Sequence, residues 1–278
     1  MPKLTRGRSC GFTLIELLVA IAVIALLVGL LLPALGKARA SARAVACLSN
    51  TRTIALVMQM YAEDDEDNFY PTARMPGMGP DVAPFELSWL YLTGPYVDAT
   101  APQPARGESP ITPVQFASYR EQLEVYACPS DRAPNWDDKT MPRMASYGIN
   151  AYFTPNHPPY WGVRPDEIAF PTRTVLAAEQ SETITMPMSG EVMGNPMDHF
   201  MPMFWGDPPA VAEAMNPMVF AVQWDKQTAT PNVIEHTRHP GEAANYIFTD
   251  GHAAALGFDE TWRQTPGEAP DRDWYDTK

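Results

Sequence analysis

The pattern of apolar and polar positions divides the chain into a long helical N-terminal segment and a mixed C-terminal part. Residues 12–32 form an almost unbroken apolar run that contains one charged side chain, Glu16. A helix of about 21 residues is roughly 31 Å long, which is enough to span the hydrocarbon core of a bilayer. Secretory signal peptides have a shorter apolar core, about 7–15 residues, followed by a small-residue cleavage site. The run therefore favours a membrane-spanning helix.

The helical pattern continues beyond this run. Apolar residues recur at steps of three and four: Leu35, Ala38, Ala42, Val45, Ala46, Ile54, Val57 and Tyr61. The lysines and arginines of this segment fall mainly at the positions between them. We expect one helix from about Thr13 to Ala62, about 75 Å long. Pro33 removes one backbone hydrogen bond and Gly36 adds flexibility, which predicts a kink or local melting at 33–36. The second half of the helix is predicted to be amphipathic and to lie on a globular head.

Short strands are predicted in the C-terminal part. The best candidates are residues 146–150, 173–180 and 245–256, which are bounded by Pro, Gly and Asn. The last segment is typical of a β-hairpin with Asp250-Gly251 as a two-residue turn. One long helix followed by several strands indicates an α+β head in which the helix covers one face of a sheet. Residues 181–232 are the least predictable and are interpreted as an insertion.

Glu16 is an unusual residue for a membrane helix. A buried acidic side chain costs about 2.5–3.5 kcal/mol at the centre of a spanning helix, and less near an interface. Such a residue is expected to have a partner and a function. A plain signal anchor would explain the length of the apolar run but neither Glu16 nor the Gly11-Phe12 junction that precedes it. Basic residues flank both ends of the run, so charge alone does not settle its orientation.

The N-terminal residues resemble the cleavage and methylation site of type IV prepilins and type II secretion pseudopilins. The resemblance rests on a basic leader, on Pro33 and on the segment Gly11-Phe12-Thr13-Leu14-Ile15-Glu16. It implies that a prepilin peptidase cuts between Gly11 and Phe12 on the cytoplasmic side and that Phe12 is then N-methylated. It also implies that Glu16 and Pro33 are assembly residues of a filament.

The resemblance sets the expected organisation and location. We expect a cleaved leader at 1–11, a transmembrane and assembly helix at 12–35, its amphipathic continuation at 36–62 and an exported head at 63–278. The protein would cross the inner membrane once, with a cytoplasmic N-terminus and a head in the periplasm or at the cell surface. The implied fold is pilin-like, with an antiparallel sheet in the head. The implied partners are other pilin or pseudopilin subunits, the prepilin peptidase and the inner-membrane assembly machinery.

Composition and cysteine usage agree with an exported head. The formal net charge of -13 argues against nucleic acid as a partner. Many of the 29 prolines lie in loop-like runs of the head. Of the three cysteines, Cys10 lies in the leader, which leaves Cys47 and Cys128 as a pair. They either form a disulfide between helix and head or remain two buried thiols.

Several head segments are similar, in order, to a large group of secretion-G-like pilin proteins. That group often has a His, about nine residues, and then Asp-Gly near the C-terminus. Here ten residues separate His239 from Asp250, and His236 is an alternative first histidine. The group brings no enzymatic activity, so no catalytic residue is expected. In an alternative hypothesis, His236, His239, Asp250 and His252 bind zinc or another divalent ion.

Two other segments contain residue types that bind metal ions. The acidic residues at 62–68 offer oxygen ligands for Ca²⁺, but they lack the glycine and the distal glutamate of an EF-hand loop. The methionines at 186–218 offer soft ligands for Cu(I), although flexible apolar packing is the preferred interpretation. No cofactor is therefore expected beyond a divalent ion such as Ca²⁺ or Zn²⁺.

These observations lead to two function hypotheses. The first is a structural, non-enzymatic subunit of a type IV pilus or type II secretion pseudopilus. The second is a membrane-anchored exported binding module, or a metal-dependent enzyme, that uses the C-terminal His/Asp cluster.

Overall fold

The computed structural model describes the two parts of the chain that the sequence pattern predicts. The described residues are 14–66, 68–71, 89–101, 123–138, 143–153, 163–185, 192–194, 199–200, 224–225, 230–231 and 234–261. The chain divides into two units, residues 1–42 and residues 43–278. The second unit contains the C-terminal part of the long helix together with the head, and each unit is described by itself.

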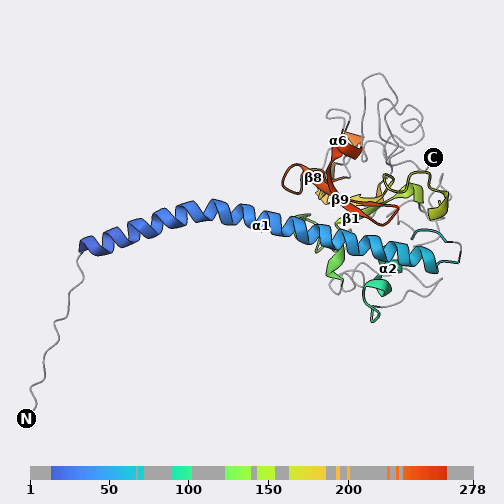
Figure 1. Cartoon of the computed structure of the whole chain (residues 1–278), viewed down its shortest axis with the longest axis horizontal. Helices are drawn as coiled ribbons and strands as arrows, with labels where there is room; N and C mark the ends of the chain where they lie inside the picture. Colours follow the sequence, from blue (N-terminus) through green and yellow to red (C-terminus); the bar gives the residue numbers. More distant parts are fainter. Residues whose placement is uncertain are drawn as a thin grey trace, which may run out of the picture. The chain divides into compact units, whose positions relative to one another are not determined.

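The long helix α1 runs without interruption from Leu14 to Asp64 (Figure 1). Both ends lie within two residues of those predicted. Pro33 lies inside the helix, and residues 33–36 keep the helical conformation. Of the two predicted outcomes, local melting is therefore wrong, and a kink at 33–36 stays a prediction. Helix formation is cooperative, so the turns on both sides of Pro33 continue across the single missing hydrogen bond.

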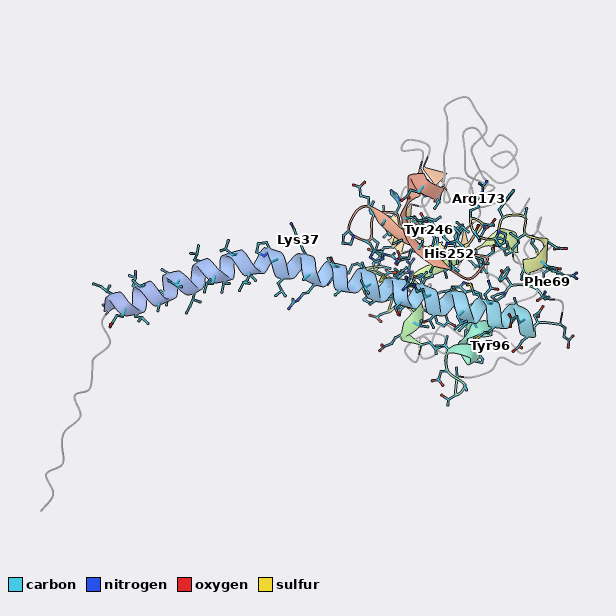
Figure 2. All side chains as sticks on the ribbon, viewed as in Figure 1. Lys37, Phe69, Tyr96, Arg173, Tyr246 and His252 are labelled. Atoms are coloured by element: carbon cyan, nitrogen blue, oxygen red, sulfur yellow. A yellow bond between two sulfur atoms is a disulfide. The ribbon has the colours of Figure 1, made fainter. Side chains whose placement is uncertain are left out.

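Residues 14–39 of α1 all have exposed side chains (Figure 2). Among them, Leu14 is 80% exposed and Leu30 is 70% exposed. Within the described part of the chain, α1 is the one helix that is long and apolar enough to cross a membrane. Exposing this much apolar surface to water is unfavourable, since burial is worth roughly 25 cal/mol per Å². The segment therefore needs lipid or another apolar surface around it.

From Cys47 onward, one face of α1 is buried within the second unit. The buried residues follow the helical period: Cys47, Thr51, Ile54, Ala55, Val57, Met58 and Ala62. Val45, which was expected on the apolar face, is instead 69% exposed. The amphipathic half predicted for the helix is thus confirmed, but its buried face starts at Cys47.

A five-stranded sheet forms the centre of the head, in the order β5-β1-β2-β8-β9. Its strands are β1 (Tyr147–Asn150), β2 (Val175–Glu179), β5 (His199–Phe200), β8 (Ala243–Phe248) and β9 (Ala253–Gly257). Neighbouring strands pair antiparallel from β1 to β9, whereas β5 adds to β1 in parallel. The α+β class and the strands predicted at 146–150, 173–180 and 245–256 are confirmed. The parallel edge strand was not predicted.

The remaining elements are short. Two strand pairs lie outside the main sheet, β3 (Thr183–Thr185) with β4 (Val192–Gly194) and β6 (Trp224–Asp225) with β7 (Thr230–Pro231). The other helical elements are α2 (Trp89–Val97), α6 (Phe258–Thr261) and the 3-10 turns η1 (Glu124–Tyr126), η2 (Ala151–Phe153) and η3 (Pro165–Glu167). Figure 1 shows β1, β8 and β9 on one side of the head part of α1 and α2 on the other.

Among the described residues, an apolar core packs α2, β1, β2 and β8 against α1. Ile54 and Met58 of α1, Trp89 of α2, and Ile149 and Ala177 of the sheet all belong to it. Aromatic side chains complete this core through edge-to-face contacts, such as the Trp89–Tyr126 pair at 5.5 Å between ring centroids.

The β8–β9 hairpin has a longer turn than predicted. Thr249, Asp250 and Gly251 form a three-residue loop, because Phe248 N–H donates to the His252 carbonyl at 2.9 Å. Gly251 N–H donates to the Phe248 carbonyl, and Gly251 has φ +87°. Such loops need their last residue in the left-handed region, which glycine adopts without a steric cost. The two-residue turn predicted from Asp250-Gly251 is therefore wrong by one residue.

Candidate functional site

The proposed processing and assembly residues lie at the start of α1. Gly11 and Phe12 are outside the described residues, so the predicted cleavage position is not described. Glu16 lies in the first turn of α1. A carboxylate there interacts favourably with the positive end of the helix dipole, by about 0.3–1 kcal/mol. Glu16 and Pro33 both lie in the part of α1, residues 14–39, whose side chains are all exposed.

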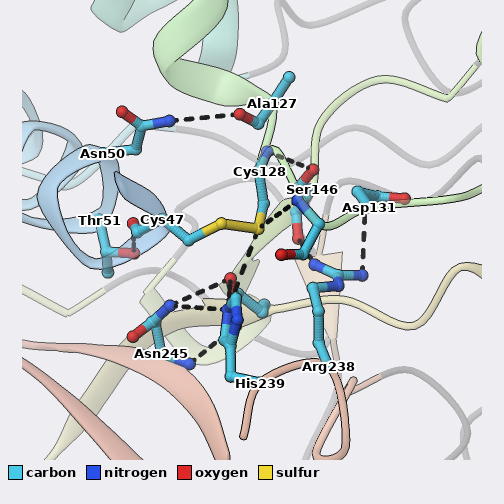
Figure 3. The surroundings of a disulfide bond; sticks show 12 residues. Cys47, Asn50, Thr51, Ala127, Cys128, Asp131, Ser146, Arg238, His239 and Asn245 are labelled. Atoms are coloured by element: carbon cyan, nitrogen blue, oxygen red, sulfur yellow. Dashed lines mark hydrogen bonds and ion pairs between the residues drawn. A yellow bond between two sulfur atoms is a disulfide. The ribbon is translucent and has the colours of Figure 1, made fainter. Parts of the chain in front are cut away.

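In the head, a disulfide joins Cys47 of α1 to Cys128 in the loop after η1 (Figure 3). The sulfur atoms are 1.96 Å apart and the Cα atoms 5.0 Å apart. The sequence left open whether these cysteines are bridged, and in the structure they are. A bridge across 81 positions restricts the unfolded chain strongly, and such bridges typically add about 2–4 kcal/mol to the free energy of unfolding. The disulfide therefore links the helix covalently to the head.

Hydrogen bonds align the chain segments around the bridge (Figure 3). The Asn50 side-chain amide donates to the Ala127 carbonyl at 3.2 Å, and Cys128 N–H donates to the Ser146 hydroxyl at 2.8 Å. The Tyr147 hydroxyl donates to the Cys47 carbonyl at 3.3 Å. Burial raises the pKa of Tyr147, so its hydroxyl stays protonated and remains a donor. These bonds fix α1 against β1 and the loop after η1.

A buried polar cluster lies directly beside the disulfide. His239 Nε2 is 2.9 Å from Glu179 Oε1 and 3.9 Å from Cys128 Sγ. Asn245 donates its backbone N–H to Glu179 Oε2 at 2.9 Å, and its side-chain amide lies 3.1 Å from His239 Nε2. Glu179, at the end of β2, is 0% exposed. A buried carboxylate needs such partners because an unpaired charge in the interior is strongly unfavourable.

A second buried cluster is an ion-pair network. Asp131 lies 2.9 Å from Arg143 and 3.5 Å from Arg238, and the three side chains are at most 1% exposed. Burial raises the pKa of Asp131, but the charges of Arg143 and Arg238 and the hydrogen bonds from Ser146 and Ala133 outweigh this effect and hold the pKa below its usual range. Burial lowers the pKa of Arg143, and the charge of Asp131 opposes that shift.

The two arginines also bind backbone carbonyls. Arg143 donates to the carbonyls of Ser181 and Gln180, and Arg238 donates to the Gln180 carbonyl. The network therefore ties the loop after η1 to the end of β2 and to the segment before β8.

The four residues proposed as a metal site do not meet. His239 pairs with Ala243 at the beginning of β8, while Asp250 and His252 lie at the turn after its end. Five residues of strand separate these positions by about 16 Å. Asp250 accepts a hydrogen bond from His252 N–H, and the His252 ring stacks on Phe248. His236 instead contacts the Ile234 carbonyl and the Phe258 ring. The predicted four-residue metal site is thus wrong.

In the acidic segment at 62–68, two carboxylates accept hydrogen bonds, one from α2 and one from the residues that follow the helix. Asp64 accepts from the Tyr96 hydroxyl at 3.0 Å, and Asp65 accepts from Phe69 N–H at 3.2 Å. Among the described residues, the only group of ligand-type side chains that converges is Cys47, Cys128, Glu179 and His239. The methionines at 186–218 lie almost entirely outside the described residues.

The sequence pattern did not single out Glu179, Asn245, Asp131, Arg143 or Arg238. One signal was present: Glu179 ends a strand whose other four residues are apolar, and all five are buried. A charged residue in such a run predicts a buried partner. The identity of that partner depends on pairing across 60 positions, which no local pattern reveals.

Comparison with known proteins gives two matches. Residues 6–32 match a prokaryotic N-terminal methylation motif. Residues 36–174, half of the chain, match a family described as protein of unknown function (DUF1559). No curated protein and no solved structure matches the chain.

Proposed function

The chain belongs to the family described as protein of unknown function (DUF1559) and carries a prepilin-type methylation motif, and from this premise we propose that it is a pilin-like structural subunit. In this proposal a prepilin peptidase cuts between Gly11 and Phe12, and Phe12 is N-methylated. The mature chain then enters a type IV pilus or type II secretion pseudopilus. The observation that carries the proposal is the methylation motif at the start of a long, exposed, apolar helix.

The motif and the helix suggest how subunits assemble. Cleavage creates an α-amino group at Phe12, a cation at the edge of the membrane, while Glu16 supplies an anion four positions later. In a filament, Glu16 of one subunit neutralises the amino group of its neighbour. A charge left unpaired in an apolar environment is strongly disfavoured, whereas a paired charge fixes the register of the two helices. The apolar side chains of residues 14–35 then supply the packing surface.

The proposal makes the head a structural part rather than a catalytic one. Its two polar clusters are buried and lie against the disulfide and the ends of strands, where they stabilise the fold. The alternative function depended on a His/Asp cluster, and the separation of His239 from Asp250 and His252 removes that support. The subunit would be anchored in the inner membrane before assembly, with its head in the periplasm or at the cell surface.

The proposal is tested by following the head with an antibody in cells that carry the assembly machinery. We expect the processed chain in the filament fraction released by shearing, and we expect it to remain in the membrane fraction when the prepilin peptidase is deleted. A chain that stays in the membrane fraction of wild-type cells, with filaments formed normally by other subunits, would contradict a role as a filament subunit.

A further inference from the structure

Four side chains of types that commonly bind metal ions converge at the disulfide: Cys47 and Cys128, which form it, with Glu179 and His239. Figure 3 shows His239 next to the two bridged cysteines. Their ligand atoms all lie within 4.8 Å of one another, and all four residues are buried. We propose that reduction of the Cys47–Cys128 disulfide converts this group into a closed zinc site. The same residues would then link α1 to the head in two ways, through a disulfide or through a metal ion.

The two distances from His239 Nε2 to its neighbouring ligand atoms are close to those in a zinc site. Tetrahedral zinc with bonds of about 2.0–2.3 Å places its ligand atoms about 3.3–3.8 Å apart. His239 Nε2 lies 3.9 Å from Cys128 Sγ and 2.9 Å from Glu179 Oε1, so each distance needs to change by less than about 0.5 Å. The two sulfur atoms must separate by about 2 Å once their bond is broken. Rotation about the Cα–Cβ bonds of Cys47 and Cys128 supplies movement of this kind.

The surrounding groups orient the proposed ligands. Asn245 N–H holds Glu179 Oε2, which leaves Oε1 directed toward His239. Asn50 and Ser146 bind the carbonyl and the N–H of the peptide between Ala127 and Cys128, which fixes the backbone directly before Cys128. Hydrogen bonds from such supporting groups are a regular feature of metal sites and strengthen metal binding.

The group of four residues carries the same formal charge in the disulfide form as in the zinc-bound form. Counted formally as one disulfide, one carboxylate and one neutral imidazole, the four residues carry a charge of about -1. Two thiolates, the carboxylate and Zn²⁺ also sum to -1. Zinc therefore compensates the two negative charges that thiolate formation would otherwise place in a buried site. Two sulfurs, one imidazole and one carboxylate also match the ligand types that zinc prefers.

The conversion is balanced when a phosphine is the reductant. The phosphine attacks the disulfide, the S–S bond breaks, and water supplies the oxygen of the phosphine oxide and the two protons of the thiols. Each thiol then loses its proton when it binds zinc. In sum, disulfide, phosphine, water and Zn²⁺ give the zinc dithiolate, phosphine oxide and two protons. Because all four ligands come from the chain and are buried, the site has no open position and is structural.

The test uses the full chain in detergent micelles with Cys10→Ser, so that only Cys47 and Cys128 carry thiols. The chain is prepared oxidised and phosphine-reduced, incubated with Zn²⁺ or Co²⁺ and freed of unbound metal. Bound zinc is counted by atomic emission, and cobalt is followed by the visible absorption of a tetrahedral thiolate site. His239→Gln and Glu179→Gln test the ligands, while His236→Gln and His252→Gln are matched controls outside the group.

We expect one zinc ion per reduced chain and none per oxidised chain, with the near-ultraviolet circular dichroism of the head retained in the zinc form. His239→Gln and Glu179→Gln should weaken zinc binding by at least about tenfold, and the control variants should bind like the parent. Any of three results would overturn the proposal: no stoichiometric zinc in the reduced chain, equal binding by the oxidised chain, or zinc held by His239→Gln as tightly as by the parent. Zinc bound without a folded head would also overturn it.

Discussion

Replacing Glu16 with Gln is expected to leave the chain processed and inserted in the membrane but to remove it from filaments. The amide keeps the size of the side chain and loses its charge, so the amino group of a neighbouring Phe12 has no anion to neutralise it. Leaving one member of a buried charge pair unpaired costs about 3–5 kcal/mol, which corresponds to at least about a hundredfold less incorporation. The measurement compares the variant in the sheared filament and membrane fractions.

Glu63→Gln is the matched control for this prediction. It makes the same substitution on the same helix, at an exposed position in the last turn of α1. It should enter filaments like the parent chain. If Glu16→Gln also enters filaments at the parent level, charge pairing does not specify assembly.

The second large effect is expected from Asp131→Asn. Asp131 is buried between Arg143 and Arg238, so loss of its charge leaves two buried cations with too little compensation. We expect a loss of about 3–5 kcal/mol in the free energy of unfolding at pH 7. The measurement is denaturant unfolding of the full chain in detergent, followed by near-ultraviolet circular dichroism of the head.

The loss of stability caused by Asp131→Asn should become smaller as the pH falls below about 4. The pKa of Asp131 is lowered in the folded chain by the two arginines, relative to about 3.9 in the unfolded chain. The stabilisation is therefore fully present above about pH 4 and is lost as the pH falls toward the folded value. The difference between parent and variant should shrink below about pH 4. Asp166→Asn, at an exposed position in η3, should change stability by less than about 0.5 kcal/mol. A difference between parent and Asp131→Asn that is constant in acid would contradict this account.

Much of the fold follows from local patterns. The apolar run and the three- and four-residue spacing predict α1 to within two residues at each end. The strand segments around Ile149, Ala177 and Ile247 are predicted by short apolar runs between turn residues. These features depend on neighbouring residues, which is why sequence alone reveals them. The length of the hairpin turn was missed because Asp250-Gly251 fits both a two-residue turn and the end of a three-residue loop.

The polar interior of the head depends on long-range pairing. Glu179 meets His239 across 60 positions, and Asp131 in the loop after η1 meets Arg238 in the segment before β8. The position of His239 also explains why the metal hypothesis failed. The motif that ends in Asp250-Gly251 places its histidine at one end of β8 and its turn at the other, so the two ends do not form a common site.

The central claim is that the chain is processed as a prepilin, and the intact mass of the mature protein tests it most directly. The account predicts a chain that begins at Phe12, carries one added methyl group and retains the Cys47–Cys128 disulfide. A chain that still begins at Met1, or one cut after the apolar run near Pro33, would contradict it.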